Sequence, residues 1–331
     1  PNSGNHLFRS GALDVIGYNY HNKDIPNVPA NFPDKPFIIT ESNSALMTRG
    51  YYRMPSDRMF IWPERWDKSF ADSTFACSSY ENCHVPWGNT HEESLKLVRD
   101  NDFISGQYVW TGFDYIGEPT PYGWPARSSY FGIVDLAGFP KDVYYLYQSE
   151  WTDKQVLHLF PHWNWKKGET VDVWAYYNRA DEVELFLNGE SLGVKSKPDD
   201  ASHVCWRVPF TPGTLKAVSR RDGKEVLTRE IRTAGEPARI MLIPDRSALH
   251  ADGTDLSFVT VEIQDKDGNL VPDADTQPML ADLATLQRLI YNLNGSVRGR
   301  LGIFEEDLDW LKGRYDHYNE ASRGRVTGFV L

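Results

Sequence analysis

Residues 35–42 read Lys-Pro-Phe-Ile-Ile-Thr-Glu-Ser, a short apolar run that starts after a proline and ends on one carboxylate, Glu41. A strand that is apolar on both faces is typical of the interior of a parallel barrel. Barrel enzymes place their catalytic residues at the carboxyl ends of the strands. Glu41 is therefore the first candidate for a catalytic residue.

Two further strands and one helix are predicted in the first 150 residues. The strands cover residues 14–20 and 106–113, and the helix covers residues 90–100 behind a Thr90 N-cap. The long loop over residues 42–89 predicts one wall of a cleft, because loops of this length are usually functional. A complete (β/α)₈ barrel needs roughly 250 residues. These strands therefore belong either to another fold or to the C-terminal part of such a barrel.

The pattern becomes all-β from about residue 151. Alternating strands and an Asn188-Gly189 hairpin signal are spaced as in an immunoglobulin-like sandwich. The predicted strands of this module lie at residues 170–177 and 182–187, in a short stretch directly after the Asn188-Gly189 turn, and at residues 203–208 and 213–219. A second such module starts near residue 236, with strands at 239–243 and 255–264 and a turn at 265–269. Residues 277–331 change to helical spacing, which predicts a short helical tail whose origin the pattern leaves open.

The composition limits the class of partner. The formal net charge is -11 and the pI is near 5.3, without a long basic run, which argues against nucleic acid and anionic membranes. Aromatic residues make up 13% of the chain, which fits either a sugar-binding cleft or aromatic-rich sheet packing. The sequence shows no apolar run long enough to span a membrane, so membrane insertion is not expected.

The cysteines and histidines indicate no metal site and no cofactor. Three cysteines cannot define a disulfide framework in a chain of 331 residues. Cys77 and Cys83 could pair across a loop, whereas Cys205 lies in a predicted strand and is expected to be buried and inert. The histidines are scattered, and none stands at ligand spacing to a cysteine or to a second histidine.

Three sequence blocks, taken in order, point to a family. They are Gly17-Tyr18-Asn19-Tyr20, residues 37–42, and residues 108–119, which read Tyr-Val-Trp-Thr-Gly-Phe-Asp-Tyr-Ile-Gly-Glu-Pro. Together they resemble glycoside hydrolase family 2, and most closely its bacterial β-galactosidases that carry extra sandwich modules. The resemblance covers roughly residues 10–275. It implies that the three blocks are barrel strands six, seven and eight.

The resemblance implies a multidomain fold. Residues 1–150 would be the C-terminal part of a (β/α)₈ TIM barrel, and residues 151–235 an immunoglobulin-like β-sandwich. Residues 236–276 would be a partial second sandwich, followed by the tail over residues 277–331.

The resemblance also gives Glu41 a role. A retaining glycosidase needs one ionised carboxylate as nucleophile and a second carboxyl group as acid and base, about 5–5.5 Å apart. Glu41 occupies the nucleophile's place at the tip of strand seven. The family's acid/base glutamate follows an asparagine at the end of strand four, and no Asn-Glu dipeptide precedes Glu41. The acid/base is therefore expected in a missing N-terminal part, and this chain alone should not turn over substrate.

Neighbouring side chains are candidates for binding the sugar. Trp110 could stack on the apolar face of the sugar, or it could pack inside the barrel. Asn19 and Tyr20 lie within possible reach of Glu41. A tyrosine hydroxyl there would hydrogen-bond the carboxylate and favour its ionised form, unless Tyr20 is purely structural. His21 could bind a sugar hydroxyl or serve structure.

Three residues of the loop after the third strand are further candidates. Asp114 and Glu118 lie at the edge expected for hydroxyl recognition, and one of them is expected to touch substrate. Either could instead hold the loop through Arg127 or backbone amides. Trp124 lines an outer subsite or packs the loop.

The sequence thus predicts a retaining exo-β-glycosidase, most specifically a β-galactosidase, whose partner is a carbohydrate substrate. The family and the sandwich modules suggest a periplasmic or extracellular parent enzyme, while the oligomeric state stays open. A rival hypothesis is a non-catalytic carbohydrate-binding or adhesion protein that uses Trp163, Trp165 and Trp174 on its sandwich faces. The alternation around Trp174 favours burial and weakens this rival. A third possibility is an inactive piece of an enzyme.

Overall fold

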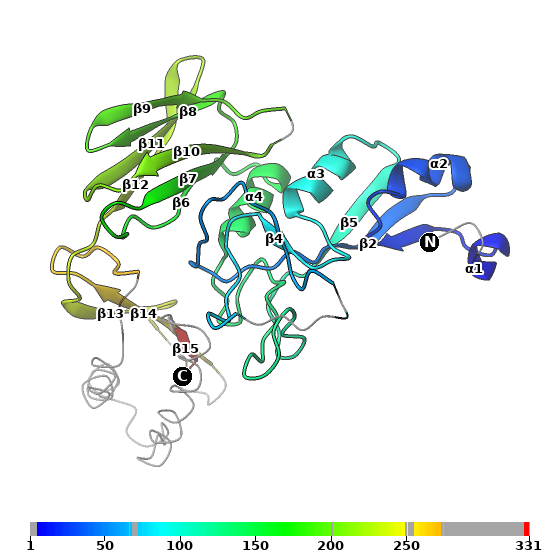
Figure 1. Cartoon of the computed structure of the whole chain (residues 1–331), viewed down its shortest axis with the longest axis horizontal. Helices are drawn as coiled ribbons and strands as arrows, with labels where there is room; N and C mark the ends of the chain where they lie inside the picture. The colour runs from blue at the N-terminus through cyan, green and yellow to red at the C-terminus, as the bar shows by residue number, and fades with distance from the viewer. Residues whose placement is uncertain are drawn as a thin grey trace, which may run out of the picture. The chain divides into compact units, whose positions relative to one another are not determined.

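The structure is a computed structural model that describes residues 5–65, 67, 72–199, 201–248, 250, 255–272, 274 and 328–330 (Figure 1). The chain divides into two compact units, residues 1–233 and residues 234–331. Most of the predicted helical tail, residues 277–331, lies outside the described residues, and its described part, residues 328–330, is wrong as helix because it forms a strand.

The first unit begins with a three-stranded parallel sheet. Its strands are β1 (Ile16–Asn19), β2 (Phe37–Asn43) and β5 (Ile104–Trp110), in the order β1-β2-β5. The three predicted strands are confirmed with slightly different bounds. Short helical segments flank β1, namely α1 (His6–Arg9), η1 (Ile25–Asn27) and α2 (Val28–Asn31).

The two faces of this sheet differ in burial. On one face, Phe37 and Ile39 are fully buried in an apolar cluster with partly buried residues of the helix between β2 and β5. On the other face, Asn19 and Thr40 are exposed. Parallel sheets normally have both faces covered. That these three strands belong to a larger (β/α)₈ barrel stays a prediction.

Helix α3 (His91–Arg99) is confirmed together with its cap. The Thr90 side chain accepts from the backbone of Glu93, whose carboxylate accepts from the Thr90 backbone, so both halves of a capping box are present. A second helix, α4 (Asp142–Trp151), was not predicted. Its buried residues Val143, Leu146 and Tyr147 have helical spacing.

The long loop between β2 and α3 contains regular structure that was not predicted. It holds the short parallel strands β3 (Phe60–Ile61) and β4 (Cys83–His84). Cys77 and Cys83 are buried free thiols, so the considered disulfide between them is wrong. Cys205 is half-buried, and burial is the main cause that raises the pKa of its thiol to about 11, which fits an inert cysteine.

Residues 157–232 form the predicted sandwich from two antiparallel sheets, β10-β7-β6 and β12-β11-β8-β9. The strands are β6 (Leu157–Phe160), β7 (Thr170–Tyr177), β8 (Glu182–Leu187), β9 (Glu190–Lys195), β10 (His203–Pro209), β11 (Thr214–Arg221) and β12 (Lys224–Arg232). Strands β6 and β12 were not predicted. Trp163 and Trp174 are buried, and Trp165 is partly buried and stacks on His162, which weakens the carbohydrate-binding rival because it required exposed rings.

Hydrogen bonds join the sandwich to the first 150 residues. The buried carboxylate of Asp172 on β7 accepts from the backbone N–H of Ser56 at 2.7 Å and from Arg207 Nε at 2.7 Å. Asp142 of α4 accepts from the Tyr52 hydroxyl and from His158 Nε2, each at 2.8 Å. The change of pattern near residue 151 therefore falls inside one compact unit.

The second unit is described by itself. Strands β13 (Arg239–Pro244), β14 (Phe258–Gln264) and β15 (Gly328–Val330) form an antiparallel sheet in that order. The predicted turn after β14 is present, and the Asp265 carboxylate holds it by accepting from the backbone N–H groups of Asp267 at 2.9 Å and Asn269 at 2.8 Å.

Glu81 makes the stability of the first unit dependent on pH. Burial and repulsion from Glu92 raise its pKa to about 8, against the lowering effect of bonds from the backbone N–H groups of Glu92 and His91. Because the carboxyl group holds its proton more tightly in the folded state, its contribution to stability is full below its ordinary pKa of 4.5 and is lost as pH rises through the folded-state pKa of about 8.

We expect Glu81→Gln to flatten the fall in unfolding free energy between about pH 5 and 8, a fall of roughly 1–4 kcal/mol in the parent. Urea unfolding at several pH values measures this slope. Glu190→Gln, at an exposed position of β9, should keep the parental slope. An unchanged slope in Glu81→Gln would contradict the assignment.

Candidate active site

The register of the parallel sheet gathers the predicted site residues. Asn19 at the end of β1 pairs with Glu41 on β2, and Asn43 on β2 pairs with Trp110 at the end of β5. Glu41 is half-exposed at this carboxyl edge. The sheet therefore brings a carboxylate, an amide and an indole ring to one edge, as the sequence predicted.

A hydrogen-bonded chain ends on the Glu41 carboxylate. The Tyr20 hydroxyl donates to Glu41 Oε2 at 2.8 Å, and the Ser44 hydroxyl donates to the Tyr20 hydroxyl at 2.8 Å. Burial is the main cause that raises the pKa of Tyr20, and the Glu41 carboxylate adds to the rise. Tyr20 therefore keeps its proton and donates a hydrogen bond to the Glu41 carboxylate. Ser44 was not predicted from the sequence.

The backbone around this chain has unusual conformations. Tyr20 has a φ of 58°, and Asn43 and Ser44 have φ of 78° and 51°. Non-glycine residues rarely adopt such angles, and they cluster at functional sites. The Tyr20 N–H donates to the Glu41 carbonyl at 2.7 Å, which fixes the turn after β1 on β2.

The end of β2 is seated on buried polar groups. Ser42 donates to Asn43 Oδ1 at 2.6 Å, and Asn43 Nδ2 donates to the Thr90 carbonyl at 3.1 Å. Gly88 lies so close that an added Cβ would be 2.4 Å from the Asn43 carbonyl oxygen. This close packing fixes the backbone that carries Glu41.

Trp110, Tyr115 and Glu118 form a second cluster at the same edge. The half-buried Trp110 ring meets the Tyr115 ring edge to face, with centroids 6.0 Å apart. The Tyr115 hydroxyl donates to the exposed carboxylate of Glu118. Glu118 is therefore free to face a ligand with its remaining acceptor sites, and Tyr115 was missed by the sequence reasoning.

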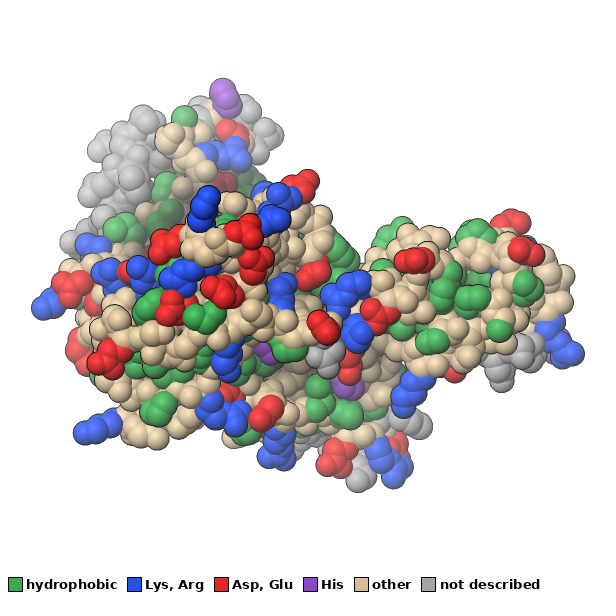
Figure 2. Space-filling model, turned by 90° about the horizontal axis from the view of Figure 1, so that it is seen from above, with side chains coloured by type: hydrophobic (Ala, Val, Ile, Leu, Met, Phe, Trp, Pro, Cys, Tyr) green, Lys and Arg blue, Asp and Glu red, His purple; other side chains and the backbone are tan. Residues whose placement is uncertain are grey.

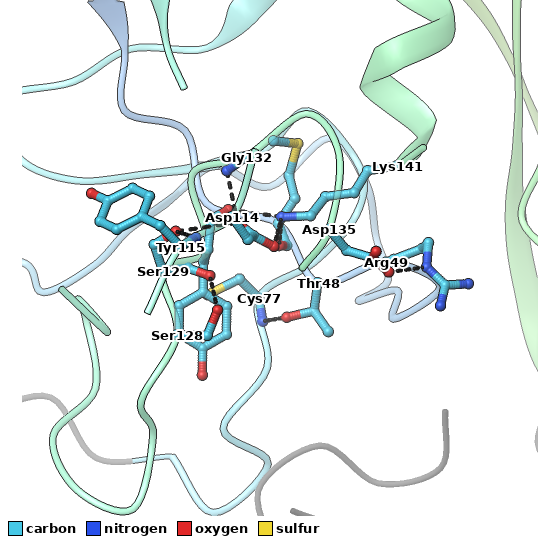
Figure 3. Close-up of polar contacts among 12 residues, drawn as sticks. Thr48, Arg49, Cys77, Asp114, Tyr115, Ser128, Ser129, Gly132, Asp135 and Lys141 are labelled. Atoms are coloured by element: carbon cyan, nitrogen blue, oxygen red, sulfur yellow. Dashed lines mark hydrogen bonds and ion pairs between the residues drawn. The ribbon is translucent and has the colours of Figure 1, made fainter. Parts of the chain in front are cut away.

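The carboxylate of Asp114 is bound by other residues of the protein, as Figure 3 shows. Its carboxylate lies 2.8 Å from Nζ of Lys141, and the two side chains are 9% and 1% exposed. It also accepts from the Gly132 N–H at 2.8 Å. Lys141 further donates to the carbonyls of Met47 and Tyr130. Asp114 thus holds the loop through Lys141 and a backbone amide, and not through Arg127.

The other predicted residues lie at the rim. The exposed Asn19 side chain accepts from the Thr40 hydroxyl at 2.6 Å, and His21 Nδ1 lies 3.3 Å from Asp24 Oδ2. Trp124 is 77% exposed, with the Arg127 guanidinium 4.4 Å from its ring centroid. Trp124 therefore does not pack into the loop's core.

The described part of the chain carries surface charges of both signs. Lys and Arg side chains are interspersed with Asp and Glu over the face that Figure 2 shows. Within the described residues, no group of three His, Cys, Asp or Glu side chains could hold a metal ion. In the same residues, no helix is long and apolar enough to cross a membrane.

Comparison with known proteins gives matches over most of the chain. A model described as a domain of unknown function (DUF4982) matches residues 168–227, and glycoside hydrolase family 2 C-terminal domain 5 matches residues 240–278. The chain is 84% identical over 275 residues to Beta-galactosidase BoGH2A of Bacteroides ovatus, covering 83% of this chain and 32% of the relative.

More distant matches are also glycosidases and cover similar shares of the chain. A Beta-glucuronidase of Formosa agariphila is 27% identical over 260 residues, covering 73% of this chain and 24% of the relative. The crystal structure of a beta-glycosidase from Bacteroides vulgatus matches with a TM-score of 0.70 at 32% identity, over 79% of this chain and 36% of that protein. The chain thus spans about a third, 32%, of the length of Beta-galactosidase BoGH2A.

Proposed function

Since the chain belongs to glycoside hydrolase family 2, we propose that it is part of a retaining β-galactosidase in which Glu41 is the nucleophile. Residues 1–150 supply the last strands of a catalytic (β/α)₈ barrel in this proposal. The single observation that carries it is the hydrogen bond from Tyr20 to Glu41 at the carboxyl edge of the parallel sheet.

The geometry suits the two steps of a retaining mechanism. Glu41 attacks the anomeric carbon while the bond to the leaving oxygen breaks and a second carboxyl group protonates that oxygen. Water then hydrolyses the glycosyl ester, with the second group acting as base. The Tyr20 hydroxyl engages Oε2 of Glu41, which leaves Oε1 for the attack. We propose that the acid/base glutamate belongs to a part of the longer enzyme outside this sequence.

Charge favours a neutral sugar over a uronic acid. The carboxylate of a glucuronide needs a cationic partner when it is bound. Three cations of the surrounding loops are each paired with an aspartate: Lys141 with Asp114, Arg49 with Asp135, and Arg53 with Asp72. The acidic residues Glu41 and Glu118 face the same edge and would repel a uronate. These features and the 84% identity to a β-galactosidase support a galactoside.

Trapping the glycosyl-enzyme tests the proposal. In the full-length enzyme, an activated 2-deoxy-2-fluoro-β-galactoside should form a stable ester, because the fluorine slows both formation and hydrolysis of the intermediate while the activated leaving group speeds only its formation. Mass spectrometry of a peptic digest should place the label on Glu41. A label on any other carboxylate, or turnover of galactosides without labelling, would overturn the nucleophile assignment.

A further inference from the structure

Tyr115 lies between two side chains of the candidate site. Its ring meets the Trp110 ring at an interplanar angle of 79°, and its hydroxyl donates to the Glu118 carboxylate. From the sequence alone, Trp110 and Glu118 are separate candidates for sugar binding. The structure joins them through one phenol.

The backbone that carries Tyr115 is held firmly. The Tyr115 N–H donates to the Ser129 hydroxyl at 3.1 Å, and the Ser129 N–H donates to the Tyr115 carbonyl at 2.9 Å. One residue before, Asp114 is fixed by its buried ion pair with Lys141. The position of Tyr115 is therefore fixed. An exposed glutamate on a loop can adopt several rotamers, and a hydrogen bond from a fixed tyrosine favours one of them.

Glu118 itself shows a local constraint. It has a φ of 43°, a conformation that is uncommon outside glycine. The Gly117 N–H donates to the Arg127 carbonyl at 2.7 Å, so a hydrogen bond connects the turn before Glu118 to a later part of the same loop. Backbone and side chain together aim this carboxylate, although its surface remains open to solvent.

The cluster lies next to Glu41. Trp110 pairs with Asn43, two positions beyond Glu41, and the Ser42 hydroxyl oxygen lies 3.1 Å from the Tyr108 carbonyl oxygen. Tyr115 is also among the lesser electrostatic influences that, after burial, raise the pKa of Tyr20. Two tyrosines, each donating to one glutamate, therefore face the same edge of the sheet.

We propose that Tyr115 is a positioning residue that holds Glu118 against Trp110, so that the Glu118 carboxylate binds one hydroxyl group of the sugar that Trp110 stacks on. This inference rests on the proposed function and adds Glu118 as a group that recognises one hydroxyl of the sugar. A charged acceptor of this kind contributes roughly 1.5–3 kcal/mol per hydroxyl, which corresponds to about 10- to 100-fold in kcat/KM.

The test compares substrates as well as variants. In the full-length enzyme, kcat and KM are measured for an aryl β-galactoside and for its 2-, 3-, 4- and 6-deoxy analogues. We expect Glu118→Gln to lower kcat/KM on the parent sugar about 10- to 100-fold and Tyr115→Phe about 10-fold. Both losses should shrink to within about twofold on one and the same deoxy analogue, which lacks the hydroxyl that Glu118 binds.

Two comparisons separate positioning from a general structural role. The double variant Tyr115→Phe/Glu118→Gln should be no worse than Glu118→Gln alone, because Tyr115 acts through Glu118. Tyr144→Phe on α4 is the matched control and should leave every rate unchanged. Equal losses on all the analogues, additive effects in the double variant, or a fully active Tyr115→Phe would each overturn the inference.

The outcome is independent of the nucleophile assignment. If the fluoro sugar labels a residue other than Glu41, the proposed function fails whatever Tyr115 does. If it labels Glu41 while Tyr115→Phe behaves like the parent on all substrates, only the positioning role fails.

Discussion

Replacing Glu41 by glutamine in the full-length enzyme should lower kcat on a β-galactoside by at least about 10⁴-fold, equivalent to roughly 5.5 kcal/mol of transition-state stabilisation. The amide keeps the shape of the side chain and can still accept from the Tyr20 hydroxyl, which now donates at 2.8 Å. It cannot form the glycosyl ester. Folding should therefore survive while the first chemical step is lost.

The controls address both fold and mechanism. Glu190→Gln, at an exposed position of β9, should keep full activity, and the thermal unfolding of Glu41→Gln should match the parent. In the smaller variant Glu41→Gly, azide should restore turnover of an activated aryl galactoside and yield the α-galactosyl azide, because the anion attacks from the side of the missing carboxylate. More than about 1% residual activity in Glu41→Gln, or a β-azide product, would contradict the assigned role.

The second large effect concerns stability. Lys141→Met should lower the unfolding free energy by roughly 3–5 kcal/mol, because it leaves Asp114 as a buried carboxylate without its cation. Burial lowers the pKa of Lys141 and raises that of Asp114, while their mutual attraction opposes both shifts. The substitution also removes the donor to the Met47 and Tyr130 carbonyls. Urea unfolding of the protein at pH 7 measures the change.

Two further variants identify the cause. Lys141→Met/Asp114→Leu should regain much of the loss, since neither charge then remains buried. Lys96→Met removes an exposed ion pair with Asp100 and should cost no more than about 1 kcal/mol. A loss below about 1 kcal/mol in Lys141→Met, or a double variant that is less stable than the single one, would refute the buried-pair account.

Local patterns predicted the elements that depend on neighbours in sequence. The apolar run before Glu41, the Thr90 cap and the Asn188-Gly189 turn all contain their own signals, and each is present in the structure. The edge that gathers Asn19, Glu41 and Trp110 also followed from the sequence, because the carboxyl ends of parallel strands share one side of a sheet.

Contacts between distant residues could not be predicted in this way. A carboxylate after a strand can face a cleft or the core, and Asp114 faces the core only because the loop returns to place Lys141 beside it. Ser44 and Tyr115 carry no special local pattern. The role of Ser44 arises from its contact with Tyr20, and that of Tyr115 from the loop that returns to place Ser129 beside it. Helix α4 was missed because its apolar spacing lies among aromatic residues with low helix propensity.

The contact between Asp172 and Ser56 has a consequence for how such enzymes diverge. Asp172 belongs to the sandwich, yet it holds the loop that follows Glu41 in the chain, and the indole of Trp174 donates to the Ser56 hydroxyl at 3.0 Å. The sandwich is therefore not an interchangeable cassette. Exchange of this module between relatives would preserve the loop only if residues on β7 and on the loop were inherited together.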